Sequence, residues 1–288
     1  MRIAVTGATG FIGRHVLAAL QKADETTLRG EPLEIIATTR GSEGEPAPLP
    51  RVRWVQLDLQ SPPDDPLRHL SFPDVLVHLA WGGLPNYHST RHVEVELPLH
   101  ERFLERAIRD GLKAVVVAGT CFEYGMQEGQ LSEERPPQPA NPYASAKDRL
   151  RRFLEDLQAR HQFQLTWLRF FYLYGSGQPS RTLYSQLLQA ISRGDGVFDM
   201  SGGEQVRDYL PVTEAADIVA ALALRAGDDG VVNVCSGQPC TVKSLVERWA
   251  SEAHSSIRLN LGYHPYSEHE PMQFWGSNEK LRSLLETP

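Results

Sequence analysis

Tyr143 and Lys147 are the two side chains whose types and spacing most directly suggest chemistry. Asn141 can cap a helix that starts at Pro142. The two side chains should then lie one turn apart on the same helix face. A free phenol has a pKa of about 10, and a nearby ammonium should stabilise the phenolate and lower that pKa. The pair could therefore exchange a proton with a carbonyl or hydroxyl oxygen.

A hydroxyl side chain, Thr120, follows the apolar run Lys113–Gly119, which predicts a strand. Ligands of parallel sheets bind at the carboxyl ends of the strands. We therefore expect Thr120 to hydrogen-bond the reacting oxygen and to hold it within reach of Tyr143.

Three glycines, Gly7, Gly10 and Gly13, connect an apolar run to an amphipathic segment. Such glycines allow a tight turn, close approach of the backbone to a pyrophosphate, and close packing of a helix on a strand. Free N–H groups and the positive end of the helix then bind the phosphates. The sequence therefore predicts a nicotinamide dinucleotide site here, in preference to a purely structural turn. Further contacts are expected from Thr9, Phe11 and Ile12.

The end of the second predicted strand bears on the choice of dinucleotide. Arg40 lies there without an acidic neighbour, which favours the 2′-phosphate of NADP. NAD stays open, because Arg40 could instead stack on adenine without preference. Asp58 is placed to meet the adenine amino group, or to cap a turn, and Leu59 follows it. Leu79 and Ala80, at the end of the fourth predicted strand, complete the expected cofactor contacts.

The elements that must position these side chains alternate between strands and helices. Short apolar runs predict strands over Arg2–Thr6, Leu33–Thr39, Arg53–Leu57, Val75–Leu79, Lys113–Gly119 and Gln164–Phe170, and helical periodicity predicts helices over Phe11–Lys22, Thr90–Asp110 and Pro142–His161. This order predicts an α/β fold with a Rossmann-type, doubly wound parallel sheet.

The texture of the sequence changes after Phe170. A loop at 175–179 precedes predicted helices over Arg181–Arg193 and Thr213–Arg225 and a strand over Val231–Cys235. We expect a dinucleotide-binding domain over 1–170, to which 206–236 returns. A smaller, mixed substrate-binding region should comprise 171–205 and 237–288.

Composition narrows the function classes. The 288 residues carry a formal charge of 29 − 36 = −7, so no basic surface for nucleic acid or anionic lipid is expected. Cys121, Cys235 and Cys240 are sparse and widely spaced, which fits a reducing compartment. No signal-type segment and no membrane span is recognisable, so a cytoplasmic protein is expected.

The sequence resembles the extended short-chain dehydrogenases/reductases of the nucleotide-sugar epimerase/dehydratase family over nearly its whole length. The matching motifs are Gly7-x-x-Gly10-x-x-Gly13, His78-Leu79-Ala80, Thr120 before Tyr124-Gly125, Tyr143-x-x-x-Lys147, Arg169 with Tyr174-Gly175-x-Gly177-Gln178, Arg207-Asp208-Tyr209, and Val232-Asn233-Val234-Cys235-Ser236-Gly237. The resemblance implies that Thr120, Tyr143 and Lys147 form a catalytic triad, with Lys147 also holding the nicotinamide ribose. It implies further that Arg207 contacts a substrate diphosphate and that the enzyme is a homodimer.

Several positions depart from the family pattern. Sugar 4,6-dehydratases carry Asp-Glu directly after the catalytic hydroxyl residue, where Cys121 and Phe122 stand here. Neither side chain can supply the acid and base that remove water, so a dehydratase is disfavoured. Glu123 should point to the other side of an extended segment. Tyr172 replaces the Asn that many relatives have, which puts that usual sugar-phosphate contact in doubt.

The loop Trp81–His88 extends toward the expected substrate position, although its aromatic residues could equally serve packing. The expected substrate contacts are Trp81, Cys121, Phe122, Tyr172 and Arg207. A metal site is not expected, because the spacing of three candidate ligands near the end of the chain fits no familiar motif. Those candidates are His264, His269 and Glu270.

The overall pattern is similar to 4-keto-6-deoxyhexose reductases that act on dTDP-linked sugars. We therefore expect NAD(P)H-dependent reduction of the C4 keto group of a nucleotide-linked 4-keto-6-deoxyhexose. A nucleotide-sugar 4-epimerase with tightly bound NAD is the main alternative. A catalytically silent dinucleotide-sensing regulator is disfavoured by the intact Tyr143 and Lys147 pair.

Overall fold

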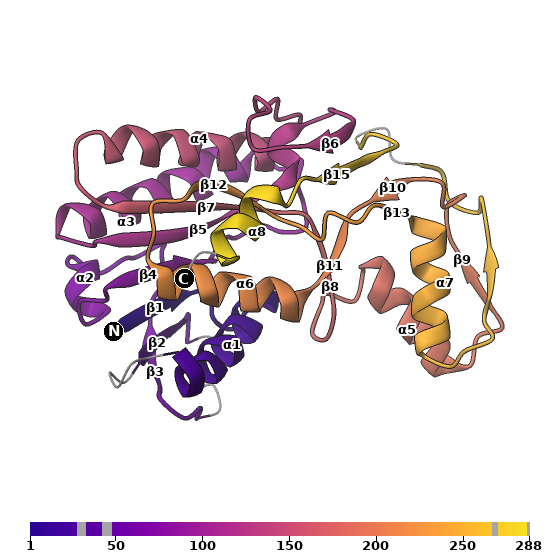
Figure 1. The fold of residues 1–288 in the computed structure, drawn as a ribbon, viewed down its shortest axis with the longest axis horizontal. Helices are drawn as coiled ribbons and strands as arrows, with labels where there is room; N and C mark the ends of the chain where they lie inside the picture. Colours follow the sequence, from indigo (N-terminus) through magenta and orange to yellow (C-terminus); the bar gives the residue numbers. More distant parts are fainter. Residues whose placement is uncertain (28–32, 42–47, 267–269, 287–288) are drawn as a thin grey trace.

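The computed structural model describes residues 1–288 except 28–32, 42–47, 267–269 and 287–288. A seven-stranded sheet forms the centre of the structure (Figure 1). Its strand order is β12-β7-β5-β4-β1-β2-β3, and each strand is parallel to the strands next to it. The strands are β1 (Arg2–Thr6), β2 (Glu34–Thr39), β3 (Val52–Gln56), β4 (Val75–His78), β5 (Ala114–Thr120), β7 (Gln164–Phe170) and β12 (Gly230–Val234). The predicted Rossmann-type fold is confirmed. The strand order reverses between β1 and β4, which is where such sheets bind ligands.

Helices cover both faces of this sheet. α1 (Phe11–Thr27) and α6 (Val212–Arg225) pack on one face with side chains such as Ile3 and Val5. α3 (Leu97–Arg109) and α4 (Pro142–Gln158) pack on the other face with Ala4. β5 is buried along its whole length, as expected for a parallel strand covered on both sides.

The helix predicted over Thr90–Asp110 forms in two parts. A π-helical turn, η1 (His92–Glu96), continues into α3. Pro98 at the start of α3 has no N–H to donate to the preceding turn, and the wider π turn suits that gap. The other short elements on the sheet are α2 (Pro66–His69) and α8 (Glu279–Glu286), of which α8 adds Leu281 to the α1 and α6 face.

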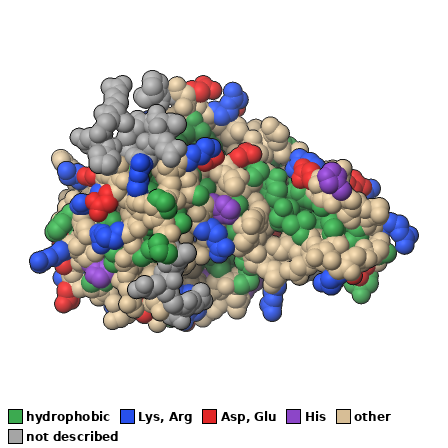
Figure 2. Space-filling view, turned by 90° about the horizontal axis from the view of Figure 1, so that it is seen from below, with side chains coloured by type: hydrophobic (Ala, Val, Ile, Leu, Met, Phe, Trp, Pro, Cys, Tyr) green, Lys and Arg blue, Asp and Glu red, His purple; other side chains and the backbone are tan. Residues whose placement is uncertain are grey.

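A smaller lobe lies beyond the carboxyl end of the sheet (Figure 1). Its core contains Leu187 of α5 and Trp249 of α7. The strands outside the central sheet form two-stranded sheets, and two further helices, α5 and α7, lie among them. These elements are β6 (Gly129–Leu131), β8 (Tyr172–Tyr174), α5 (Leu183–Arg193), β9 (Val197–Asp199), β10 (Val206–Arg207), β11 (Tyr209–Pro211), β13 (Cys240–Thr241), α7 (Val242–Glu252), β14 (Arg258–Asn260) and β15 (Phe274–Gly276). Figure 2 shows hydrophobic side chains gathered on the face of this lobe that is seen from below. The division into a cofactor domain and a substrate region stays a prediction.

None of the helices in the described part of the chain is both long enough and apolar enough to span a membrane.

Candidate active site

A cavity of about 400 Å³ opens at the carboxyl ends of β1, β2 and β4, and we call it the glycine-turn cavity. Its lining includes eight of the predicted cofactor contacts, which are Gly7, Thr9, Gly10, Arg40, Asp58, Leu59, Leu79 and Ala80. It lies at the reversal of the strand order, so its place in the sheet fits a dinucleotide.

The glycines of the turn are required by close backbone contacts. Gly7 has a φ of +70°, and a Cβ there would lie 2.7 Å from the backbone N of Ala80. Gly13 does not line the cavity; a Cβ on it would collide with the carbonyl oxygen of Gly7 and lie 2.7 Å from Cα of Ala8. The turn therefore holds α1 against the sheet and leaves a cradle without side chains in front of the helix.

The two charged residues expected at the adenosine end are both exposed. Asp58 Oδ1 accepts a hydrogen bond from the backbone N–H of Gln60 at 3.0 Å, so this carboxylate does cap a turn. It also lines the glycine-turn cavity together with Arg40. Both proposed roles of Asp58 are thus compatible with its position.

A second cavity of about 400 Å³ contains the predicted catalytic residues, and we call it the tyrosine cavity. Thr120, Tyr143 and Lys147 line it, as do Phe11 and Ile12 of the glycine turn. Leu79, Trp81 and Leu84 line both cavities, so the two spaces adjoin. A dinucleotide in the first cavity could therefore reach into the second.

The start of α4 positions Tyr143 and Lys147. Asn141 caps the helix through a 2.9 Å hydrogen bond that its Oδ1 accepts from the N–H of Ala144. The Tyr143 N–H donates to the carbonyl of Tyr87 at 3.1 Å, and its side chain lines the tyrosine cavity together with Thr120. The structure therefore brings the predicted hydroxyl and phenol together.

Electrostatics differ from the expectation for the phenol. Burial raises the pKa of Tyr143 in the chain alone, whereas we expected Lys147 together with a nicotinamide cation to lower it. The reason is desolvation of the buried phenol, which disfavours the phenolate more than the neighbouring groups stabilise it. Burial also lowers the pKa of Lys147 to about 7, while the charges of Glu123 and Glu96 oppose that shift.

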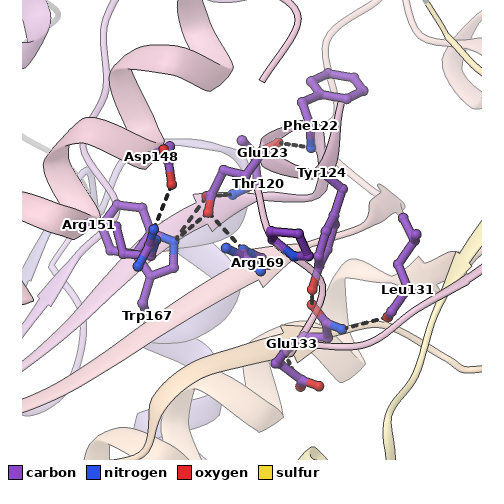
Figure 3. A network of polar contacts seen from close by, with 12 residues as sticks. Thr120, Phe122, Glu123, Tyr124, Leu131, Glu133, Asp148, Arg151, Trp167 and Arg169 are labelled. Atoms are coloured by element: carbon purple, nitrogen blue, oxygen red, sulfur yellow. Dashed lines mark hydrogen bonds and ion pairs between the residues drawn. The ribbon is translucent and has the colours of Figure 1, made fainter. Parts of the chain in front are cut away.

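The expectation of an extended segment at Glu123 is wrong. Residues Cys121–Tyr124 form a 3₁₀-helix, η2, and Glu123 is fully buried beneath Thr120 (Figure 3). Glu123 Oε1 accepts a 2.9 Å hydrogen bond from the N–H of Thr120. Thr120 starts this turn as its cap, and the side chain of Glu123 completes a capping box.

Arg169 and Trp167 on β7 bind the same carboxylate. Arg169 Nε donates to Glu123 Oε2 at 2.8 Å, and Trp167 Nε1 donates to Glu123 Oε1 at 3.0 Å (Figure 3). Glu123 thus supports the Thr120 backbone and does not line the tyrosine cavity. Sequence reasoning missed this role, although an acidic residue three positions after a possible cap is a recognisable signal.

Aromatic rings form much of the tyrosine cavity. Four of the five predicted substrate contacts line it, which are Trp81, Cys121, Phe122 and Tyr172. Tyr87 and Tyr209 line it too and were not predicted as contacts. Tyr87 packs against both Phe122 and Tyr143. The place of Tyr87 in the Trp81–His88 loop was a usable signal, and Tyr209 belongs to the Arg207-Asp208-Tyr209 motif, from which only Arg207 was taken as a contact.

Arg207 is the predicted substrate contact that does not line the tyrosine cavity. Its side chain is 2% exposed and donates to the carbonyls of Val206 and Met272. Its Nη2 lies 3.2 Å from Glu270 Oε2, an oxygen that also accepts a 2.7 Å hydrogen bond from the Tyr172 hydroxyl. The guanidinium of Arg207 is therefore already paired with the Glu270 carboxylate of the same chain.

The candidate metal ligands do not form a cluster in the described chain. His269 lies outside the described residues, and the remaining ranges contain no group of three or more side chains placed to hold a metal.

Known proteins with similar sequences cover almost all of this chain. A dTDP-6-deoxy-L-talose 4-dehydrogenase (NAD(+)) from Aggregatibacter actinomycetemcomitans is 26% identical over 96% of the chain and 100% of its own length. A UDP-glucose 4-epimerase from Azospirillum brasilense is 27% identical over 99% of the chain and 86% of its own length.

A solved structure, MoeE5 in complex with UDP-glucuronic acid and NAD, superposes with a TM-score of 0.80 at 26% identity and covers 99% of this chain and 92% of its own. The model of the NAD dependent epimerase/dehydratase family matches residues 3–235. Because that match spans most of the sheet and both cavities, the chain belongs to the NAD dependent epimerase/dehydratase family.

Proposed function

We propose that this enzyme reduces the C4 keto group of a nucleotide-linked, dTDP-bearing 4-keto-6-deoxyhexose. The observation that carries the proposal is the meeting of Thr120, Tyr143 and Lys147 in one cavity whose described lining contains no carboxylate. Removal of water from a sugar needs an acid and a base, whereas reduction needs a single proton donor beside the hydride donor. The lining therefore favours reduction over dehydration.

The chain's own residues divide the work as follows. A bound nicotinamide supplies the hydride to the carbonyl carbon. Thr120 hydrogen-bonds the carbonyl oxygen, and the Tyr143 phenol gives its proton to that oxygen as the C=O bond becomes C–O–H. Lys147, which lines the tyrosine cavity, binds the nicotinamide ribose in this proposal, and the contact between the two cavities supports that role.

The character of the tyrosine cavity supports a 6-deoxy sugar. Its aromatic wall offers apolar surface to a C6 methyl group. The talose 4-dehydrogenase relative has a name that describes the same redox step at C4 in the opposite direction. Both observations support a 6-deoxy sugar, and the name of the relative adds the position C4.

A nucleotide-sugar 4-epimerase is the second candidate, because the Azospirillum relative carries that name. An epimerase keeps its dinucleotide and consumes none, so purified protein separates the candidates. The reductase should oxidise NADPH in proportion to product when dTDP-, GDP-, CDP- and UDP-linked 4-keto sugars are supplied in turn, with dTDP giving the highest kcat/KM. Retained dinucleotide absorbance with no net NADPH consumption would establish the epimerase instead.

We propose NADP(H) as the preferred cofactor, because Arg40 lines the adenosine end of the glycine-turn cavity. Replacing Arg40 with Ser should weaken NADPH binding by roughly 10-fold, the loss of one charge-assisted contact, and leave NADH binding nearly unchanged. Dissociation constants from cofactor fluorescence measure both. Equal losses of affinity for NADPH and NADH would contradict the preference for NADP(H). The test matters because the talose 4-dehydrogenase relative is named for NAD(+) and not for NADP(+).

The cytoplasmic location and the homodimer stay predictions.

A further inference from the structure

The Lys147 ammonium is stabilised in an unusual way for a buried charge. Lys147 is 2% exposed, yet no ion pair to it is found within the described residues. Its Nζ lies 3.9 Å from the centroid of the Trp81 ring and donates one hydrogen bond, to the carbonyl of Ala118. An aromatic face attracts a cation through its quadrupole, and most strongly where water is excluded.

The Trp81 ring is fixed from its edge and from its face. Its Nε1 donates to Nδ1 of His92 at 3.1 Å, and the ring stacks on His100 with centroids 4.4 Å apart. Glu96 lies 3.7 Å from the Nε2 of His100 and accepts a 3.0 Å hydrogen bond from the N–H of Gly82. The indole is therefore presented to Lys147 by a scaffold that joins α3 to the loop after β4.

The charged and titratable groups facing Lys147 come from several elements. Burial lowers the pKa of His100 to about 4 and that of His78 well below its ordinary value, so both rings are neutral at pH 7. Glu123 on η2 and Glu96 on η1 favour the ammonium from a distance, and Tyr143 on α4 is neutral because burial raises its pKa. Trp81 and the carbonyl of Ala118 are thus the groups in direct contact that favour the cation over the neutral amine, and Trp81 is the one that a substitution can remove.

We propose that Trp81 is a positioning residue whose indole face holds the Lys147 ammonium, in place of a carboxylate, where the two cavities adjoin. An uncharged ring stabilises the cation without setting a negative charge beside an anionic dinucleotide. Removing the ring leaves the ammonium buried with one hydrogen bond. The pKa of Lys147 then falls, because desolvation favours the neutral amine.

The test measures Lys147 itself in the cofactor-free protein. Only the neutral amine reacts with acetic anhydride, so the pH dependence of Lys147 acetylation, followed by peptide mass spectrometry, reports its pKa. In Trp81→Leu the midpoint should move to lower pH by roughly one unit, and in Trp81→Phe by less, since Phe keeps a weaker aromatic face. Exposed Lys243 is the internal reference, and its profile should not change.

Trp81→Phe keeps the test decisive if Trp81→Leu does not fold. An unchanged or raised midpoint for Lys147 in the folded variant would overturn the proposal. This readout needs no substrate, so it stands apart from the proposed reaction. The alternative, a purely substrate-contacting Trp81, would raise KM in Trp81→Phe without moving the acetylation midpoint.

Discussion

The glycine-turn cavity and the tyrosine cavity have similar volumes but are built differently. The first is formed by the glycine turn and by mostly aliphatic and polar side chains near the ends of β1, β2, β3 and β4, with Arg40, Asp58, Arg91 and Glu96 as its charged lining. The second is formed by side chains from 11–12, 79–87, 118–122, 143–147, 170–184 and Tyr209, many of them aromatic.

Under the proposed function, this difference separates recognition of the cofactor from recognition of the substrate. A dinucleotide is bound by features that one strand end and the next helix supply together, so a short motif suffices. A sugar is bound by side chains that meet only after the sheet and the smaller lobe have packed. Substitutions should therefore affect the two cavities separately.

The largest expected effect comes from Tyr143→Phe, which should stop the chemistry while leaving both cavities in place. In the proposed reaction the phenol donates the proton, so kcat should fall on the order of 100- to 10,000-fold. The ring packing on Trp81 and Tyr87 and the backbone bond to Tyr87 are retained by Phe. Single-turnover NADPH oxidation with the best sugar of the panel measures the loss.

Cofactor titration of the same variant is the control. The NADPH dissociation constant should stay within about 2-fold of the parent, because one hydroxyl is lost from the neighbouring cavity. Turnover comparable to the parent would show that the proton comes from another group.

The second largest effect is expected from Gly13→Ala, a substitution in the glycine turn that should affect the cofactor cavity and the stability of the fold. Gly13→Ala places a methyl group against the backbone of Gly7 and Ala8, neither of which can move without displacing α1 from β1. The free energy of unfolding should fall by about 3 kcal/mol, with loss of dinucleotide binding. Chemical denaturation followed by circular dichroism measures it.

Gly196→Ala in the smaller lobe is the matched control, because nothing lies within 4 Å of a Cβ at that position. Its free energy of unfolding should change by less than about 0.5 kcal/mol. Equal effects of the two substitutions would mean that the cradle is less tightly packed than the distances indicate.

The sequence predicts the strands of the central sheet well for a physical reason. Strands such as β1 and β5 are buried on both faces and are therefore continuous apolar runs, and the expected dinucleotide contacts follow their carboxyl ends. The pair Tyr143 and Lys147 is equally local, since helical spacing alone sets both side chains on one face. Strand bounds shifted by a residue, as for β5, which includes Thr120, whereas α1 ends at Thr27 and not at the predicted Lys22, and α4 ends at Gln158 and not at the predicted His161.

Other parts of the site depend on contacts that no local pattern records. Glu123 lies under Thr120 because Arg169 and Trp167, on the neighbouring strand β7, hold its carboxylate. Arg207 does not line the tyrosine cavity, and its guanidinium binds the Glu270 carboxylate. Glu270 lies more than 60 residues away in the sequence, so no local pattern indicates this pair. The raised pKa of Tyr143 likewise follows from burial, which the sequence does not give.

The smallest effect is expected from Glu270→Gln, which tests whether Glu270 competes with a substrate diphosphate for Arg207. If Arg207 is to contact a substrate diphosphate, it must first leave Glu270. A neutral amide holds a guanidinium less strongly than a carboxylate does. In Glu270→Gln the KM for the nucleotide sugar should therefore fall by about 3-fold with kcat little changed, as initial-rate kinetics would show.

Glu204→Gln, an exposed carboxylate of the same lobe without a contact to Arg207, is the matched control and should leave KM unchanged. A raised KM in Glu270→Gln would contradict the competition, because it would mean that Glu270 orients Arg207 for the substrate. The KM for NADPH discriminates further. It should stay constant in both variants, since neither Glu204 nor Glu270 lines the glycine-turn cavity and the two cavities should respond separately to charge.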